Sequence, residues 1–220
     1  MTRTIKCISP VDGSVYCERE TVSDEAMVEA FARAKKAQKD WRALSISERA
    51  EYCSAAVDAM VAMKDEIVPE LAKAMGRPVR FGAGEVGGFE ERARHMISIA
   101  QGALAPVQLP AKDGFEREIT REPHGVVMTI APWNFPYMTA VNSVIPALMA
   151  GNVSILKHAS STLVVGDRFA AAFAAAGLPE GVFQHLVLSH GQTAQILKNR
   201  LADMVCFTGS VPAGRTIERE

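Results

Sequence analysis

The chain has 220 residues, a formal net charge of −1, and a composition that is 48% hydrophobic and 22% charged, as in ordinary globular proteins. This balance gives no reason to expect binding to nucleic acid or to an anionic membrane, and no run reaches the roughly 18 apolar residues of a membrane span. The first residues lack the apolar core of a signal peptide, so a cytoplasmic location is expected.

The first part of the chain is predicted to be mainly helical. Ser23 is suited to cap a helix, because its hydroxyl oxygen can accept a hydrogen bond from a free amide of the first turn. Ser45 and Glu48 have the spacing of a capping box that begins a second helix. A third helix is predicted over about 65–75, with Gly76 as the left-handed residue that ends it.

The stretch FGAGEVGG at 81–88 contains the letters G-x-G-x-x-G of a dinucleotide-binding turn. In that motif the glycines turn a strand into a helix whose amides face a pyrophosphate. Here a helix end precedes the motif, and position 107, near where an acidic residue is required, is a valine. The stretch is therefore predicted to be the flexible start of a helix over about 90–100, not a cofactor site.

After Pro110 the pattern changes to that of strands. Apolar or basic side chains alternate with acidic or polar ones over 115–121, which is typical of an exposed or edge strand. Four short strands are then predicted at 126–130, 153–156, 182–187 and 204–207. The helices between them are predicted at about 139–149, 162–176 and 193–198. This alternation predicts a parallel sheet with right-handed crossovers, whose ligands would bind at the carboxyl ends of the strands.

Two stretches at those strand ends suggest chemistry. In APWNFP, the amide of Asn134 could stabilise an oxyanion beside the ring of Trp133, although a buried tryptophan next to a turn asparagine is the simpler interpretation. In FTGSVPAG, Gly209 and Ser210 could open a helix whose free amides bind an anion, or could form an ordinary capping turn. Lys157, after the second strand, could bind ribose hydroxyls or be a solvated loop residue.

The order and spacing of TIAPWNFPYMTAVNSVIPALMAGNVSILKHAS and FTGSVPAG resemble the aldehyde dehydrogenase superfamily. The run EREITREPHGVVMTIAPWNFP and the GEV of 84–86 are similar to that family as well. The resemblance covers essentially the whole chain, is most specific at 121–157 and 205–214, and is closest in texture to the semialdehyde dehydrogenases. It implies oxidation of a small aldehyde to a carboxylic acid with NAD or NADP, through a cysteine thiohemiacetal, hydride transfer and thioester hydrolysis.

The resemblance also implies roles for individual residues. Asn134 matches the oxyanion-hole amide, and Lys157 matches the lysine that binds the adenosine ribose. Ser160 stands where NAD-preferring members commonly have a glutamate, so NADP should be tolerated. The other positions that match the cofactor site are Ile130, Pro132, Trp133, Gly209 and Ser210. Because this family binds its cofactor without G-x-G-x-x-G, the resemblance too argues against a cofactor at 81–88.

The expected fold class is α/β, with an incomplete Rossmann-like parallel sheet, N-terminal helices and an edge-strand oligomerisation arm. The expected divisions are a helical part of the cofactor-binding domain at 1–110, the arm at 111–122, and an incomplete Rossmann-like NAD(P)-binding part at 123–220. The resemblance places the nucleophilic cysteine and the water-activating glutamate after Glu220. We therefore expect no catalytic domain in these residues, no activity from them alone, and a dimer or tetramer in the complete form. A non-catalytic nucleotide-binding or assembly fragment is the alternative.

Two positions depart from the family pattern. His158 replaces the proline that follows the lysine, and Ser189 replaces the glycine expected after the third strand, with one inserted residue. The four cysteines and five histidines show no metal-ligand or C-x-x-C spacing, so neither a metal site nor a disulfide is predicted. None of the cysteines lies where it could replace the missing nucleophile.

Overall fold

Four parallel strands form the central sheet, in the order β7-β6-β5-β8, in the computed structural model, which describes residues 2–220. The strands are β5 (Val126–Ile130), β6 (Val153–Lys157), β7 (Phe183–His185) and β8 (Met204–Phe207). Every residue of the central strands β5 and β6 is buried, whereas the edge strands are partly exposed. Burial on both faces explains why the central strands are continuous apolar runs rather than alternating ones. The predicted α/β fold class and parallel sheet are confirmed.

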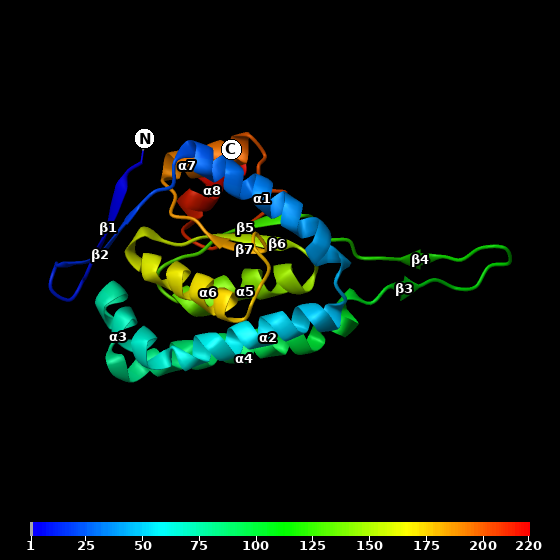
Figure 1. The fold of residues 1–220 in the computed structure, drawn as a ribbon, viewed down its shortest axis with the longest axis horizontal. Helices are drawn as coiled ribbons and strands as arrows, with labels where there is room; N and C mark the ends of the chain where they lie inside the picture. Colours follow the sequence, from blue (N-terminus) through cyan, green and yellow to red (C-terminus); the bar gives the residue numbers. More distant parts are fainter. Residues whose placement is uncertain (1) are drawn as a thin grey trace.

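Helices cover both faces of this sheet (Figure 1). On one face lie α5 (Pro136–Met149) and α6 (Leu163–Ala175), and on the other lie α1 (Asp24–Ala43), α7 (His190–Lys198) and α8 (Val211–Arg219). An outer layer, α2 (Ile46–Ala62) and α4 (Val79–Leu104), packs against α5 and α6, with α3 (Lys64–Met75) at its end. In the part of the chain that is described, each helix is too short or too polar to cross a membrane.

The local signals for helix ends are confirmed. The Ser23 hydroxyl accepts a hydrogen bond from the amide of Ala26 at 3.1 Å at the start of α1. Ser45 and Glu48 form both bonds of the capping box at the start of α2. Gly76 ends α3 with φ of 71°, a left-handed conformation that glycine adopts without the strain of a Cβ.

The prediction that residues 1–110 are helical is wrong for the first twenty residues. Here β1 (Thr4–Ile8) and β2 (Val15–Glu20) form an antiparallel hairpin. Asp12 and Gly13 make the turn: the amide of Ser14 donates to Asp12 Oδ1 at 2.9 Å, and Gly13 has φ of 75°. An Asp-Gly pair between two short β-type runs is a strong sequence signal for a β-hairpin, and Asp12-Gly13 is such a pair.

The prediction that 81–88 is a flexible helix start is also wrong, because these residues lie inside α4, which begins at Val79. Two of the glycines face neighbouring elements. A Cβ on Gly82 would lie 2.8 Å from Val68 Cγ1, and one on Gly88 would lie 2.8 Å from Met138 Cε. Close packing against α3 and α5 therefore outweighs the low helix propensity of glycine.

The segment expected as an arm projects from the body as a hairpin (Figure 1). Regular pairing is limited to β3 (Val107–Gln108) and β4 (Glu118–Ile119), with one further bridge between Lys112 and Phe115, so the strand predicted over 115–121 is reduced to two residues. A two-stranded hairpin without a third strand or a helix packed on it is only marginally stable, which accounts for the short pairing. Phe115 and Ile119 are 61% and 55% exposed. The role of the arm in oligomerisation stays a prediction.

The glycines of α4 give a matched test of close packing. We expect Gly82→Ala to lower the free energy of unfolding by about 1–3 kcal/mol, because the added methyl group would collide with Val68. Gly84→Ala, on the same helix with open space around the new Cβ, should raise it by about 0.5–1 kcal/mol, the gain in helix propensity. Urea unfolding of both variants measures the difference. Equal effects of the same sign would contradict this account of α4.

Candidate functional site

The carboxyl ends of three adjacent strands bring predicted and unpredicted residues together. Ile130 of β5 pairs with Lys157 of β6 on one side and with Phe207 of β8 on the other. The three residues are therefore neighbours at the edge of the sheet where ligands of open parallel sheets bind. The family resemblance predicts Ile130 and Lys157 as site residues. Phe207, which was not predicted, supplies an aromatic ring beside them.

A cavity of about 250 Å³ lies over this edge, between α7 and α8. Its walls include Ile130, Lys157, Ala194, Leu197, Phe207 and Ile217. Most of the lining is apolar, and it also carries one cation, Lys157, and one carboxylate, Glu220. Such a cavity fits a flat heteroaromatic ring that carries a polar group at its edge.

Lys157 is buried, with 7% of its surface exposed, so the interpretation as a solvated loop lysine is wrong. Its ammonium group donates to the carbonyl oxygen of His158 at 3.2 Å. Burial lowers the pKa of Lys157, because the charged form loses its hydration. An ammonium group has three donors, so the cavity offers hydrogen bonds to hydroxyl groups of a ligand.

A larger hollow, of about 880 Å³, lies beside this cavity, and His190 lines both. Ser160 and Ser189 lie on its wall together with Arg3 and Lys6 from the N-terminal segment. Asp24 contributes one negative charge. The hollow therefore carries more positive than negative charge. Among the described residues, His190 is the one that lines both the hollow and the apolar cavity.

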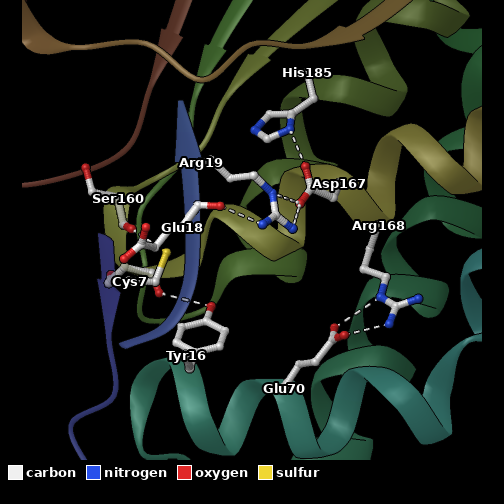
Figure 2. Close-up of polar contacts among 10 residues, drawn as sticks. Cys7, Tyr16, Glu18, Arg19, Glu70, Ser160, Asp167, Arg168 and His185 are labelled. Carbon is white, nitrogen blue, oxygen red and sulfur yellow. Dashed lines mark hydrogen bonds and ion pairs between the residues drawn. The ribbon is translucent and has the colours of Figure 1, made fainter. Parts of the chain in front are cut away.

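The β1–β2 hairpin holds the turn that carries Ser160, the 3₁₀ segment η1 (Ser160–Thr162) (Figure 2). The Cys7 thiol donates to the carbonyl oxygen of Ser160 at 3.0 Å, and the Tyr16 hydroxyl donates to that of Ser161 at 3.4 Å. These contacts join residues more than 140 positions apart. The hairpin, which the sequence analysis missed, therefore forms part of the candidate site.

An ion pair anchors the same hairpin to α6 (Figure 2). Arg19 Nη2 lies 2.9 Å from Asp167 Oδ2, and His185 Nδ1 lies 3.2 Å from the other carboxylate oxygen. Burial opposes ionisation of Asp167, but hydrogen bonds from His185 and Arg19 outweigh it and lower the pKa of the carboxyl group. The charged carboxylate thus fixes the hairpin against the helix that follows η1.

The Trp133–Asn134 loop follows β5 and is open to solvent. Trp133 is 54% exposed, so the alternative of a buried tryptophan is wrong, and Asn134 is exposed as well. Neither residue, nor Pro132, lines the two hollows. The structure therefore places the candidate oxyanion residue on a separate loop, four residues after Ile130, which lines the smaller cavity.

Gly209 and Ser210 begin α8 as the sequence predicts. Ser210 accepts a hydrogen bond from the amide of Ala213 at 3.4 Å, which makes it the cap of α8. A Cβ on Gly209 would lie 2.5 Å from the ring of Phe207. The glycine therefore lets the chain leave β8 close to the aromatic ring that lines the cavity. Neither residue lines the cavity itself.

The two departures from the family pattern have defined roles. His158 is fully buried: its Nδ1 accepts from the amide of Ala159 at 3.0 Å, so Nε2 carries the proton and lies 3.3 Å from the carbonyl oxygen of Pro136. Burial lowers the pKa of His158 to about 3. Ser189 caps α7 in a capping box with Gln192. A neutral histidine thus joins the end of β6 to the start of α5.

Several residues of the two hollows escaped the sequence analysis. They are Arg3, Lys6, His190, Ala194, Leu197, Phe207 and Ile217. A signal for Ala194, Leu197 and Ile217 was present, since these apolar residues recur at helical spacing on α7 and α8, whereas Phe207 ends β8. The cations could not be found this way, because β1 lies far from the sheet in sequence.

The comparisons with known proteins identify the family of the chain. A family model described as the aldehyde dehydrogenase family matches residues 1–220. A succinate-semialdehyde dehydrogenase (NADP+) of Mycobacterium tuberculosis strain H37Rv is 33% identical, over 97% of this chain and 47% of its own. An NADP-dependent glyceraldehyde-3-phosphate dehydrogenase of Streptococcus equinus is 34% identical, over 97% of this chain and 46% of its own.

A solved structure shares the fold. The crystal structure of a NAD-dependent benzaldehyde dehydrogenase from Corynebacterium glutamicum has a TM-score of 0.90 and 32% identity, over 99% of this chain and 48% of that one. The chain spans about half the length of the curated relatives it matches. Since the family model matches from the first residue to the last, the chain belongs to the aldehyde dehydrogenase family.

Proposed function

We propose that residues 1–220 supply the cofactor-binding half of an enzyme that oxidises an aldehyde to a carboxylic acid with NAD or NADP. The observation that carries the proposal is the buried Lys157, which lines a mostly apolar cavity at the carboxyl edge of the sheet. Relatives with NADP in their names act on a semialdehyde and on an aldehyde phosphate, so a semialdehyde is the first substrate class to test.

The residues present fit such a cofactor. The apolar cavity would hold the adenine ring, and Lys157 would donate to the ribose hydroxyls. Ser160, Arg3 and Lys6 would face a 2′-phosphate in the larger hollow, with two positive charges available to it. The bound cofactor supplies the hydride acceptor. These residues of the chain do no more than bind and orient it.

Asn134 is the residue we assign to the chemistry itself. Its exposed side-chain amide can donate a hydrogen bond to an oxygen that becomes negatively charged when a nucleophile adds to an aldehyde. The adjacent segment of α5 is buried, so the loop is held on a rigid element. We also propose that the β3–β4 hairpin, with its exposed Phe115 and Ile119, serves assembly into a dimer or tetramer.

The role of Lys157 is tested by Lys157→Met, which keeps the length of the side chain and removes the charge. We expect the dissociation constants of both NAD and NADP to rise at least about tenfold, because one charge-assisted hydrogen bond is worth about 1.5–3 kcal/mol. Stability should not fall, since a buried charge is replaced by an apolar group. Titration calorimetry measures binding, and unchanged affinity in the folded variant would reject the proposed cofactor site.

Cofactor choice is tested at Ser160 in the protein that contains this chain. Ser160→Glu should shift the ratio of dissociation constants toward NAD, because a carboxylate about 4 Å from the 2′-phosphate costs up to roughly 4 kcal/mol before salt screening. Ser160→Ala, which adds no charge, is the control and should leave the ratio nearly unchanged. Wild type should bind NADP at least as well as NAD. A strong wild-type preference for NAD contradicts the assignment.

The role of Asn134 is tested by Asn134→Ala in the same protein. Turnover should fall by about 10²–10³-fold, the usual cost of one oxyanion donor, while cofactor affinity changes little. Steady-state kinetics with a semialdehyde and separate cofactor titrations supply the two numbers. If turnover holds while cofactor affinity falls tenfold, Asn134 belongs to the cofactor site instead.

A further inference from the structure

The glycine-rich stretch of α4 carries one acidic residue, Glu85, that is completely buried. A buried carboxylate is strongly destabilising unless partners replace its lost hydration. Glu85 has a full set of them. Its Oε1 accepts hydrogen bonds from the amides of Tyr137 and Met138, each at 3.1 Å, and its Oε2 lies 2.8 Å from Arg77 Nη1.

Tyr137 and Met138 belong to the first turn of α5, where backbone amides have no partner within the helix. The cap residue, Phe135, supplies no side-chain hydrogen bond. Glu85 therefore caps α5 from another helix, and its negative charge also meets the positive end of the helix dipole. This fixes the start of α5 immediately after the loop that carries Asn134.

Arg77 holds the other side of the same loop. Its Nη2 donates to the carbonyl oxygen of Asn134 at 3.1 Å, and its guanidinium group lies 4.7 Å from the ring centre of Phe135. Arg77 lies between α3 and α4 and is largely buried. One ion pair thus contacts the backbone at Asn134 and the backbone at residues 137 and 138.

One glycine near Glu85 lets α4 approach α5 closely. Gly88 lies against Met138, where a Cβ would come within 2.8 Å of the methionine side chain. Because α4 approaches α5 this closely, the short carboxylate side chain reaches the amides of the first turn. The stretch with the letters of a dinucleotide motif therefore serves helix packing and the capping of α5.

We propose that Glu85, together with Arg77, is a positioning pair that sets the orientation of the Asn134 loop. It acts through the backbone on both sides of Asn134 and does not touch the reacting atoms. The inference rests on the proposed function, since its effect on turnover passes through the Asn134 amide.

The test uses Glu85→Gln in the protein that contains this chain, because glutamine keeps the shape of the side chain and removes its charge. We expect kcat to fall between about 10- and 100-fold, the effect of a displacement near 1 Å, while the cofactor dissociation constant changes less than about threefold. Glu90→Gln is the matched control: Glu90 forms a more exposed pair with Arg94 on the same helix, at 2.9 Å, and its loss should leave kcat unchanged.

A double-variant cycle separates positioning from general damage. In the Asn134→Ala background, Glu85→Gln should lower kcat by less than about twofold, because the group it positions is already gone. A full additive loss, or an unchanged kcat in folded Glu85→Gln, overturns the inference. If Glu85→Gln does not fold, Arg77→Lys replaces it in the same cycle, with the same expected fall in kcat. Lysine lacks the forked guanidinium group with which arginine binds the Glu85 carboxylate and the Asn134 carbonyl oxygen together.

Amide hydrogen exchange distinguishes failure of this inference from failure of the proposed function. If Glu85 caps α5, exchange over residues 137–138 rises at least about tenfold in Glu85→Ala, which removes the acceptor oxygen, but not in Glu90→Ala. Unchanged exchange overturns the inference whatever the kinetics. Unchanged turnover in Asn134→Ala, with faster exchange in Glu85→Ala, rejects the role of Asn134 and the effect on kcat, and leaves the capping contact in place.

Discussion

The first-turn amides of α5 have no partner within the helix and no cap from Phe135, and contacts from two distant parts of the chain meet there. Glu85 of α4 accepts from the first-turn amides, and His158, after β6, lies 3.3 Å from the carbonyl oxygen of Pro136. Because His158 precedes η1, this one helix end connects the Asn134 loop to the turn that carries Ser160. The His158 ring joins the two halves of the candidate site, because Nε2 lies 3.3 Å from the carbonyl oxygen of Pro136 and Nδ1 lies 2.9 Å from Thr162 Oγ1 in η1.

Burial determines the charge states along this connection. His158 is held neutral, with its pKa lowered to about 3 by burial, so its ring can donate from Nε2 and accept at Nδ1 at any ordinary pH. Lys157, the preceding residue, is buried too and has a lowered pKa, yet it keeps donors that the protein does not satisfy fully. A structural lysine gains little from such a position. The cost of burying it is consistent with a ligand that supplies the missing acceptors.

Local sequence patterns predict the parts of the fold that local contacts determine. The capping box of α2, the glycine end of α3 and the bounds of β5 and β8 follow from neighbouring residues alone. The continuity of α4 through its glycines does not, because it depends on packing against Val68 and Met138. Likewise the roles expected of Asn134 and Lys157 come from a family resemblance. The role of Glu85 as a cap cannot be predicted from the sequence, because its partner Tyr137 lies 52 positions away.

The same reasoning applies to the hollow beside Ser160. Its positive charges come from Arg3 and Lys6, and the hairpin behind them is tied to η1 through Cys7 and to α6 through Arg19. A neutral serine at position 160 only removes a repulsion, so under the proposed function the attraction for a phosphate comes from Arg3 and from Lys6 of β1. On that proposal, discrimination between NAD and NADP depends on how the N-terminal hairpin packs on the turn after β6, and a motif that contains only the turn describes half of it.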